Sequence, residues 1–128
     1  FECIAHPNFK KAFIRAAARD AVPSVQIDAR FPVIPVRAIA NEGSKKFLQK
    51  QRETIARFEC GELTKEAALL EIEHFWAGTL RRAVIEGDVE TGSVMAGQSV
   101  GMVKQEQSIA EILDELVAQA EKALENRG

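Results

Sequence analysis

Three prolines between residues 22 and 35 limit how much of this chain can be β-sheet. Pro23, Pro32 and Pro35 lack the backbone N–H that a strand donates to its neighbour, which confines such residues to sheet edges and irregular crossings. The overlapping stretch 31–39 is rich in β-branched residues and predicts at most one short extended segment. The core of the chain must therefore come from helices.

Apolar residues at helical spacing cover most of the remaining sequence. We expect five helices, at about residues 7–19, 45–58, 64–86, 92–103 and 108–124. The last of them opens with a capping box, in which Ser108 and Glu111 satisfy each other's free amides. Gly78 marks a break or a close contact inside the third helix. The sequence therefore predicts a mainly α fold with about five helices and at most one short strand.

Composition excludes several classes of protein. A net charge of -2 over 128 residues argues against a nucleic-acid binder, which needs a basic stripe to neutralise phosphates. No apolar run approaches the roughly 18 residues of a membrane span. Cys3 and Cys60 are isolated, so we expect reduced thiols in a cytoplasmic protein. Because the chain begins at Phe1 rather than Met, we expect that it has been cut or processed, or that further residues precede it.

Motifs for metal binding and catalysis are incomplete. Residues 92–99, GSVMAGQS, nearly match a phosphate-binding P-loop, but Gln98 stands where the loop needs lysine. Glu71 and His74 have the spacing of di-iron helical bundles without the second pair that such a site requires, which favours a solvated helix face. The histidines and cysteines do not have zinc-ligand spacing. We therefore expect no metal site and no catalytic residue in this chain.

A strip of small residues distinguishes the expected helix at 92–103. Ser93, Gly97 and Gly101 are four residues apart and would share one face of that helix. Each glycine in a helix costs about 1 kcal/mol relative to alanine, and the close approach of a flat ligand or of another backbone would explain that cost. Met95 and Gln98 flank the strip and suit an aromatic ring and its polar edge. The residues alone support a ligand pocket and a tight helix contact equally.

Three blocks of this sequence resemble one enzyme family. Residues 87–103, GDVETGSVMAGQSVGMV, are similar to the late helix of the FMN-dependent nitronate monooxygenase (2-nitropropane dioxygenase) family, most closely of its enoyl-acyl-carrier-protein reductase II branch. Residues 3–10, CIAHPNFK, resemble the segment after the last barrel strand in that family. Residues 35–41, PVRAIAN, resemble its VRA-x-x-N segment. The blocks follow the family's order and together span most of the chain.

The resemblance implies an oxidoreductase built on a (β/α)₈ TIM barrel, with FMN at the carboxy-terminal ends of the strands. Residues 1–128 would be the carboxy-terminal helical portion of that FMN-binding domain. Electrons would pass from NADH or NADPH through FMN to an enoyl thioester on acyl carrier protein, a step of fatty acid biosynthesis. In the monooxygenase branch, a small nitronate and oxygen would react instead. The resemblance assigns five residues to the cofactor pocket: Ser93, Met95, Ala96, Gly97 and Gln98.

The family's barrel strands, phosphate loops and catalytic histidine lie upstream of the three blocks. His6 is therefore not that histidine, and we expect these 128 residues alone neither to bind FMN tightly nor to turn over. They would wall one side of the pocket and contribute helices to packing, including a homodimer interface. A second hypothesis is a non-catalytic helical interaction domain, which explains the amphipathic helices but not the order of the blocks.

Overall fold

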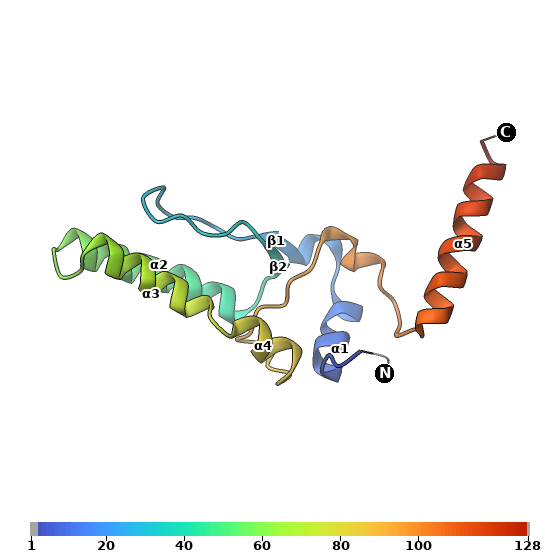
Figure 1. Ribbon diagram of the computed structural model, residues 1–128, viewed down its shortest axis with the longest axis horizontal. Helices are drawn as coiled ribbons and strands as arrows, with labels where there is room; N and C mark the ends of the chain where they lie inside the picture. Colours follow the sequence, from blue (N-terminus) through green and yellow to red (C-terminus); the bar gives the residue numbers. More distant parts are fainter. Residues whose placement is uncertain (1–2, 128) are drawn as a thin grey trace.

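The computed structural model describes residues 3–127 as an elongated molecule, with a helical hairpin at one end and a projecting helix at the other (Figure 1). The elements are α1 (Pro7–Arg15), a 3₁₀ turn η1 (Ala18–Asp20), β1 (Ala21–Pro23), β2 (Arg37–Ile39), α2 (Glu42–Glu59), α3 (Lys65–Trp76), α4 (Thr79–Val84), a 3₁₀ turn η2 (Gln98–Met102) and α5 (Ile109–Glu125). Within the described residues, the expected mainly helical fold is confirmed. The five expected α-helices are not all present, because the third is divided into α3 and α4 and the expected helix at 92–103 is not an α-helix.

The expectation of at most one strand is wrong, because two short strands pair. β1 and β2 are antiparallel, with Ala21 opposite Ile39 and Pro23 opposite Arg37. The pairing continues past the strands, since the Ser24 amide donates to the Val36 carbonyl at 2.7 Å. The prolines are compatible with this ribbon because of where they lie. Pro23 is the last residue of β1, and Pro32 and Pro35 lie in the segment that connects β1 to β2. Residues 24–36 form a long arm that runs beside the helical hairpin (Figure 1).

α2 begins earlier than the expected residue 45, because Asn41 is a strong cap. The Asn41 Oδ1 accepts the Ser44 amide and the Ser44 Oγ accepts the Asn41 amide, both at 3.0 Å. α2 then packs against α3 around Phe47, Ile55 and Ile72. Apolar burial of this kind is what holds a pair of short helices together.

The third expected helix breaks where Gly78 predicts a break. α3 ends at Trp76, and Gly78 adopts φ 76°, a left-handed conformation that glycine tolerates, before α4 begins. The first expected helix is also shorter than residues 7–19, because the chain is extended at Ala16 and Ala17 before η1.

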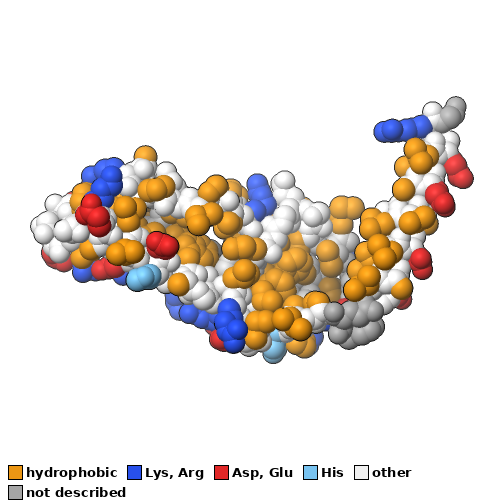
Figure 2. Space-filling view, viewed as in Figure 1, with side chains coloured by type: hydrophobic (Ala, Val, Ile, Leu, Met, Phe, Trp, Pro, Cys, Tyr) orange, Lys and Arg blue, Asp and Glu red, His pale blue; other side chains and the backbone are white. Residues whose placement is uncertain are grey.

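α5 begins at the expected capping box and projects away from the rest of the molecule (Figure 1). None of the residues Ile109–Glu125, all of which the structure describes, is buried. Its apolar residues lie open to solvent and form the hydrophobic stripe visible on this helix in Figure 2. Among residues 3–127, no helix combines the length and apolar character that a membrane crossing requires.

Gln51 fixes the arm to the hairpin. Its side chain on α2 is fully buried, donates from Nε2 to the Val25 carbonyl at 3.0 Å, and accepts at Oε1 from the Ile27 amide at 3.3 Å. The amide therefore pairs with the arm much as a neighbouring strand would. Phe31, also buried in the arm, stacks edge-on against Phe58 of α2 with ring centroids 5.2 Å apart.

We predict that Gln51→Met, which keeps the volume and removes both hydrogen bonds, lowers the free energy of unfolding by about 1–3 kcal/mol. The matched control Gln49→Met lies on the exposed side of the same helix and should change stability by less than about 0.5 kcal/mol. Urea unfolding followed by circular dichroism measures both values. Equal stabilities for the two variants would show that the arm does not depend on Gln51.

Candidate functional site

The motif segment 92–103 is not the expected α-helix, and this expectation is wrong, because within it only η2 is helical and that element is a short 3₁₀ turn. Val94 to Ala96 runs extended along β2, where the Ile39 amide donates to the Val94 carbonyl at 2.9 Å and the Ala96 amide donates to the Arg37 carbonyl at 3.0 Å. An antiparallel bridge joins Ala38 to Met95 between these bonds. Pairing with a distant strand thus overrides the local helical spacing.

Extended backbone gives successive side chains opposite directions, so the strip of small residues does not form one face. Val94 and Ala96 are 1% and 9% exposed, whereas Met95 is 39% exposed. Ala96 joins a small core that includes Ala16 of the segment after α1. Ser93 is buried, and among the described residues its Oγ is a buried side-chain oxygen without a hydrogen-bond partner. Gln98 is exposed at the start of η2.

Two glycines of the strip play different parts. A Cβ built on Gly101 would lie 2.7 Å from the backbone nitrogen of Ala18, so this glycine permits close contact between η2 and η1. A Cβ built on Gly97 would meet only the Ser99 Oγ, at 3.7 Å. Tight packing therefore explains Gly101, while the surface at Gly97 is open. The tight-contact interpretation therefore holds for Gly101, and the ligand-pocket interpretation stays a prediction at Gly97.

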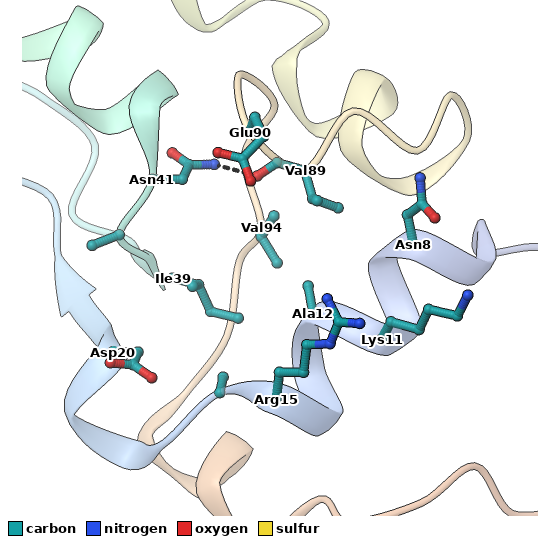
Figure 3. A pocket seen from close by; sticks show the side chains of 12 residues that line it. Asn8, Lys11, Ala12, Arg15, Asp20, Ile39, Asn41, Val89, Glu90 and Val94 are labelled. Atoms are coloured by element: carbon teal, nitrogen blue, oxygen red, sulfur yellow. Dashed lines mark hydrogen bonds between the residues drawn. The ribbon is translucent and has the colours of Figure 1, made fainter.

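Asn41 brings the second and third sequence blocks together. Its Nδ2 donates to the carbonyls of Val89 and Gly92, each at 2.8 Å. Figure 3 shows the first of these bonds. Since the same side chain caps α2, the start of the hairpin and the start of the motif segment are held at one point.

The first block joins the same assembly from α1. The His6 amide donates to the Val84 carbonyl at 2.6 Å, and Asn8 Nδ2 donates to the Gly87 carbonyl at 3.1 Å. All three blocks that carry the family resemblance are therefore in contact around residues 84–96. The order of the blocks along the chain is visible in the sequence. The structure shows in addition that the side-chain amides of Asn8 and Asn41 hold the blocks together.

Asp88 shapes the turn that leads into the motif segment. Its carboxylate accepts from the Thr91 hydroxyl, from the Thr91 amide at 2.9 Å, and from the Glu90 amide at 3.2 Å. These hydrogen bonds, first of all that of the Thr91 hydroxyl, lower the pKa of Asp88 below its ordinary value. A charged carboxylate therefore stabilises this turn.

Two hollows flank the motif segment. The first, the α1 pocket, has a volume of about 420 Å³. It lies between α1 and the β2–motif pairing, and Figure 3 shows Arg15 on one side and Ile39 and Val94 on the other. Its lining is mixed in charge: Lys11 and Arg15 from α1, with Asp20 and Glu90 opposite.

The second hollow, which we term the Met95 groove, has a volume of about 500 Å³. It lies between the arm and α3, and contains one of the five expected pocket residues, Met95. Its lining residues are Pro32, Val33, Ile34, Val36, Leu69, Ile72, Glu73, Trp76 and Met95. The sequence did not indicate this groove, because its walls come from segments far apart in the chain.

The other expected pocket residues do not share that hollow. Ser93 lies at a tight cleft of only about 20 Å³ near α4. Ala96 faces the small core, and Gly97 and Gln98 lie on the surface beyond the bridge to β2. In this segment Met95, Gly97 and Gln98 are therefore exposed, whereas Ser93 and Ala96 are buried.

Comparison with known proteins gives matches among solved structures. A scan against protein-family models finds no match, and a search of curated proteins finds none either. The chain is similar to part of an enoyl reductase II, an FMN-dependent oxidoreductase, and the resemblance stated from the three blocks is confirmed. One such solved structure is FabK from Thermotoga maritima, with a TM-score of 0.70 and 27% identity over 95% of this chain.

A second solved structure, the M276A mutant of the same FabK, matches with a TM-score of 0.66 and 23% identity over 95% of this chain. It shows the shared fold. This chain spans 33% of the first FabK chain and 31% of the second, about a third of their length. The similarity therefore concerns one part of a larger enzyme.

The two glycines allow a matched test of the motif segment. Gly101→Ala should lower the free energy of unfolding by about 1–3 kcal/mol, because its new methyl group presses on the backbone at Ala18. Gly97→Ala should leave stability unchanged or raise it by up to about 1 kcal/mol, because φ -79° suits alanine and the space is open. Urea unfolding of both variants checks this. A larger loss for Gly97→Ala would contradict the described packing.

The lowered pKa of Asp88 predicts an acid-sensitive turn. Its contribution to stability is fully present above the unfolded-state pKa of about 4 and is lost as the pH falls through the lower folded-state pKa. Asp88→Asn should therefore flatten the fall in stability on acidification. Asp114→Asn on the exposed α5 serves as the control and should keep the wild-type slope. Identical slopes for wild type and Asp88→Asn would refute the role of this carboxylate.

Proposed function

We propose that this chain is the carboxy-terminal part of a flavin-dependent enoyl-acyl-carrier-protein reductase that uses NADH or NADPH and FMN. The observation that supports this proposal most directly is the similarity between this structure and FabK, with a TM-score of 0.70 and 27% sequence identity over 95% of this chain. The contact of the three family-like blocks around residues 84–96 also supports it. The proposal includes an upstream TIM barrel, since FabK is a TIM-barrel protein and this chain matches a third of it.

The residues of the motif segment fit one wall of a flavin pocket. Met95 presents a half-exposed sulfur side chain, which packs well on an aromatic ring. The open surface at Gly97 lets a planar group approach the backbone, and the exposed Gln98 amide can donate to or accept from its polar edge. Bound FMN would supply the redox chemistry. This chain would position the ring, exclude water and support the wall through Ser93 and Ala96.

The catalytic residues in this proposal belong to the barrel. Barrels of this kind place their chemistry at the carboxy-terminal ends of the strands. The acyl-carrier-protein thioester is the proposed substrate, and a second copy of the chain is a proposed partner. The alternative, nitronate monooxygenase activity, uses the same flavin but a different substrate and oxygen as the electron acceptor. Assays with an enoyl thioester and with a nitronate therefore distinguish the two activities.

The test uses the longer protein that contains this chain. We expect a yellow protein that reduces crotonyl thioester with NADH or NADPH and oxidises nitronates slowly or not at all. Visible absorbance gives the flavin content, and nicotinamide absorbance gives the rate. A colourless protein without turnover would contradict the proposal and favour the alternative of a non-catalytic helical interaction domain. A yellow protein that acts on nitronates alone would favour the monooxygenase.

One variant tests the pocket wall in the same protein. Gly97→Leu fills the open surface and should reduce flavin content or turnover at least tenfold, with little effect on folding. Gln49→Leu, on the exposed side of α2, should keep both at the wild-type level. Wild-type flavin content and turnover in Gly97→Leu would remove this segment from the site.

A further inference from the structure

His6 caps the amino-terminal end of α1 with its imidazole ring. Its Nδ1 accepts a hydrogen bond at 3.1 Å from the Asn8 amide, one of the first helix amides, which have no partner within the helix itself. A ring nitrogen accepts only when it carries no proton, so this cap requires the neutral imidazole with its proton on Nε2. The addition of one proton to Nδ1 therefore abolishes the cap.

The same ring lies directly against the turn that precedes the motif segment. A Cβ built on Gly87 would lie 2.2 Å from His6 Nδ1 and 2.4 Å from its Cε1, so the absence of a side chain at Gly87 lets the ring pack there. The backbone is fixed on both sides of this contact. The His6 amide donates to the Val84 carbonyl at 2.6 Å, and Asn8 Nδ2 donates to the Gly87 carbonyl at 3.1 Å. The capping residue thus joins α1 to residues 84–87.

A proton on the His6 ring would be unfavourable for two reasons. The first turn of α1 contains no acidic residue, so a charged imidazolium would lie at the positive end of the helix dipole without a compensating carboxylate. The protonated Nδ1 would also face the Asn8 amide as one donor against another, and the hydrogen bond between them would be lost.

The charged residues of the neighbouring elements do not offset this cost. They are Lys10 and Lys11 on α1, Arg81 and Arg82 on α4, and Glu86 and Asp88 on either side of Gly87. The four cations repel an imidazolium. Both carboxylates already have partners, since Glu86 pairs with Arg81 at 3.8 Å and Asp88 accepts from the hydroxyl and the amide of Thr91. Within residues 3–127, none of these groups forms an ion pair with His6.

We propose that His6 is a pH-sensitive clamp between α1 and the turn at residues 84–88. Near neutral pH the uncharged ring caps α1 and rests on Gly87. Histidine is the side chain whose charge ordinarily changes between about pH 5 and 8, so mild acid protonates the ring, uncaps the helix and loosens α1 from the turn. Because Asn8, Lys11 and Arg15 line the α1 pocket (Figure 3), the clamp also holds one wall of that pocket in place.

Hydrogen exchange in the longer protein that contains this chain tests the clamp, because it measures α1 directly. Exchange rates are compared at about pH 7.5 and about pH 5.5, each corrected for the intrinsic rate at that pH. We expect the amides of residues 8–15 to lose protection about fivefold at the lower pH, since a lost cap frays the helix. The amides of residues 47–58 in α2 should change less than about twofold.

Three variants separate the cap from the charge. His6→Asn replaces the ring with an N-cap that does not titrate, so α1 should be equally protected at both pH values. His6→Ala removes the cap and should show the low protection at both. His74→Asn changes the other histidine of the chain, which is exposed on α3, and should keep the wild-type loss of protection. Circular dichroism at both pH values checks that each variant is folded.

Equal protection of α1 at the two pH values in the wild-type protein would overturn the proposal. So would a loss of protection in His6→Asn as large as that of the wild type, because another titrating group would then be responsible. The measurement depends on neither flavin nor turnover, so its outcome is separate from that of the proposed function.

Discussion

The rest of this structure depends on the hydrogen bonds of the Asn41 side chain. Its oxygen caps α2, and its nitrogen donates to two carbonyls of the turn that precedes the motif segment. A buried acceptor left without its donor costs about 1–3 kcal/mol, so one side chain fixes both the hairpin and the turn. The direction in which Val94 to Ala96 leaves this turn determines which residues face the groove and which face α1.

The site is therefore a consequence of strand pairing rather than of a helix face. Once Ala38 pairs with Met95, alternation places Met95 on the groove side and Val94 and Ala96 on the other. Gly101 is explained by the close backbone of Ala18, which leaves Gly97 as the glycine with an open surface. The two glycines of the motif thus differ: Gly101 permits close packing, and Gly97 leaves an open surface.

Features encoded by neighbouring residues could be predicted from the sequence. The start of α5 follows from Ser108 and Glu111, and the break between α3 and α4 follows from Gly78, because both depend on contacts within a few residues. The extended motif segment could not be predicted in this way, since its partner β2 lies far earlier in the chain. The resemblance named Met95 as a site residue, but only the fold shows that it lines a groove with Trp76.

The exposure of α5 has a consequence for how the chain opens and closes. No residue of Ile109–Glu125, a fully described helix, is buried, so its backbone hydrogen bonds are protected by little more than the helix itself. Such a segment behaves as its own cooperative unit and unfolds locally without disturbing the hairpin. Its amide protons will exchange with solvent deuterium long before those of α2 and α3, unless another surface covers the stripe.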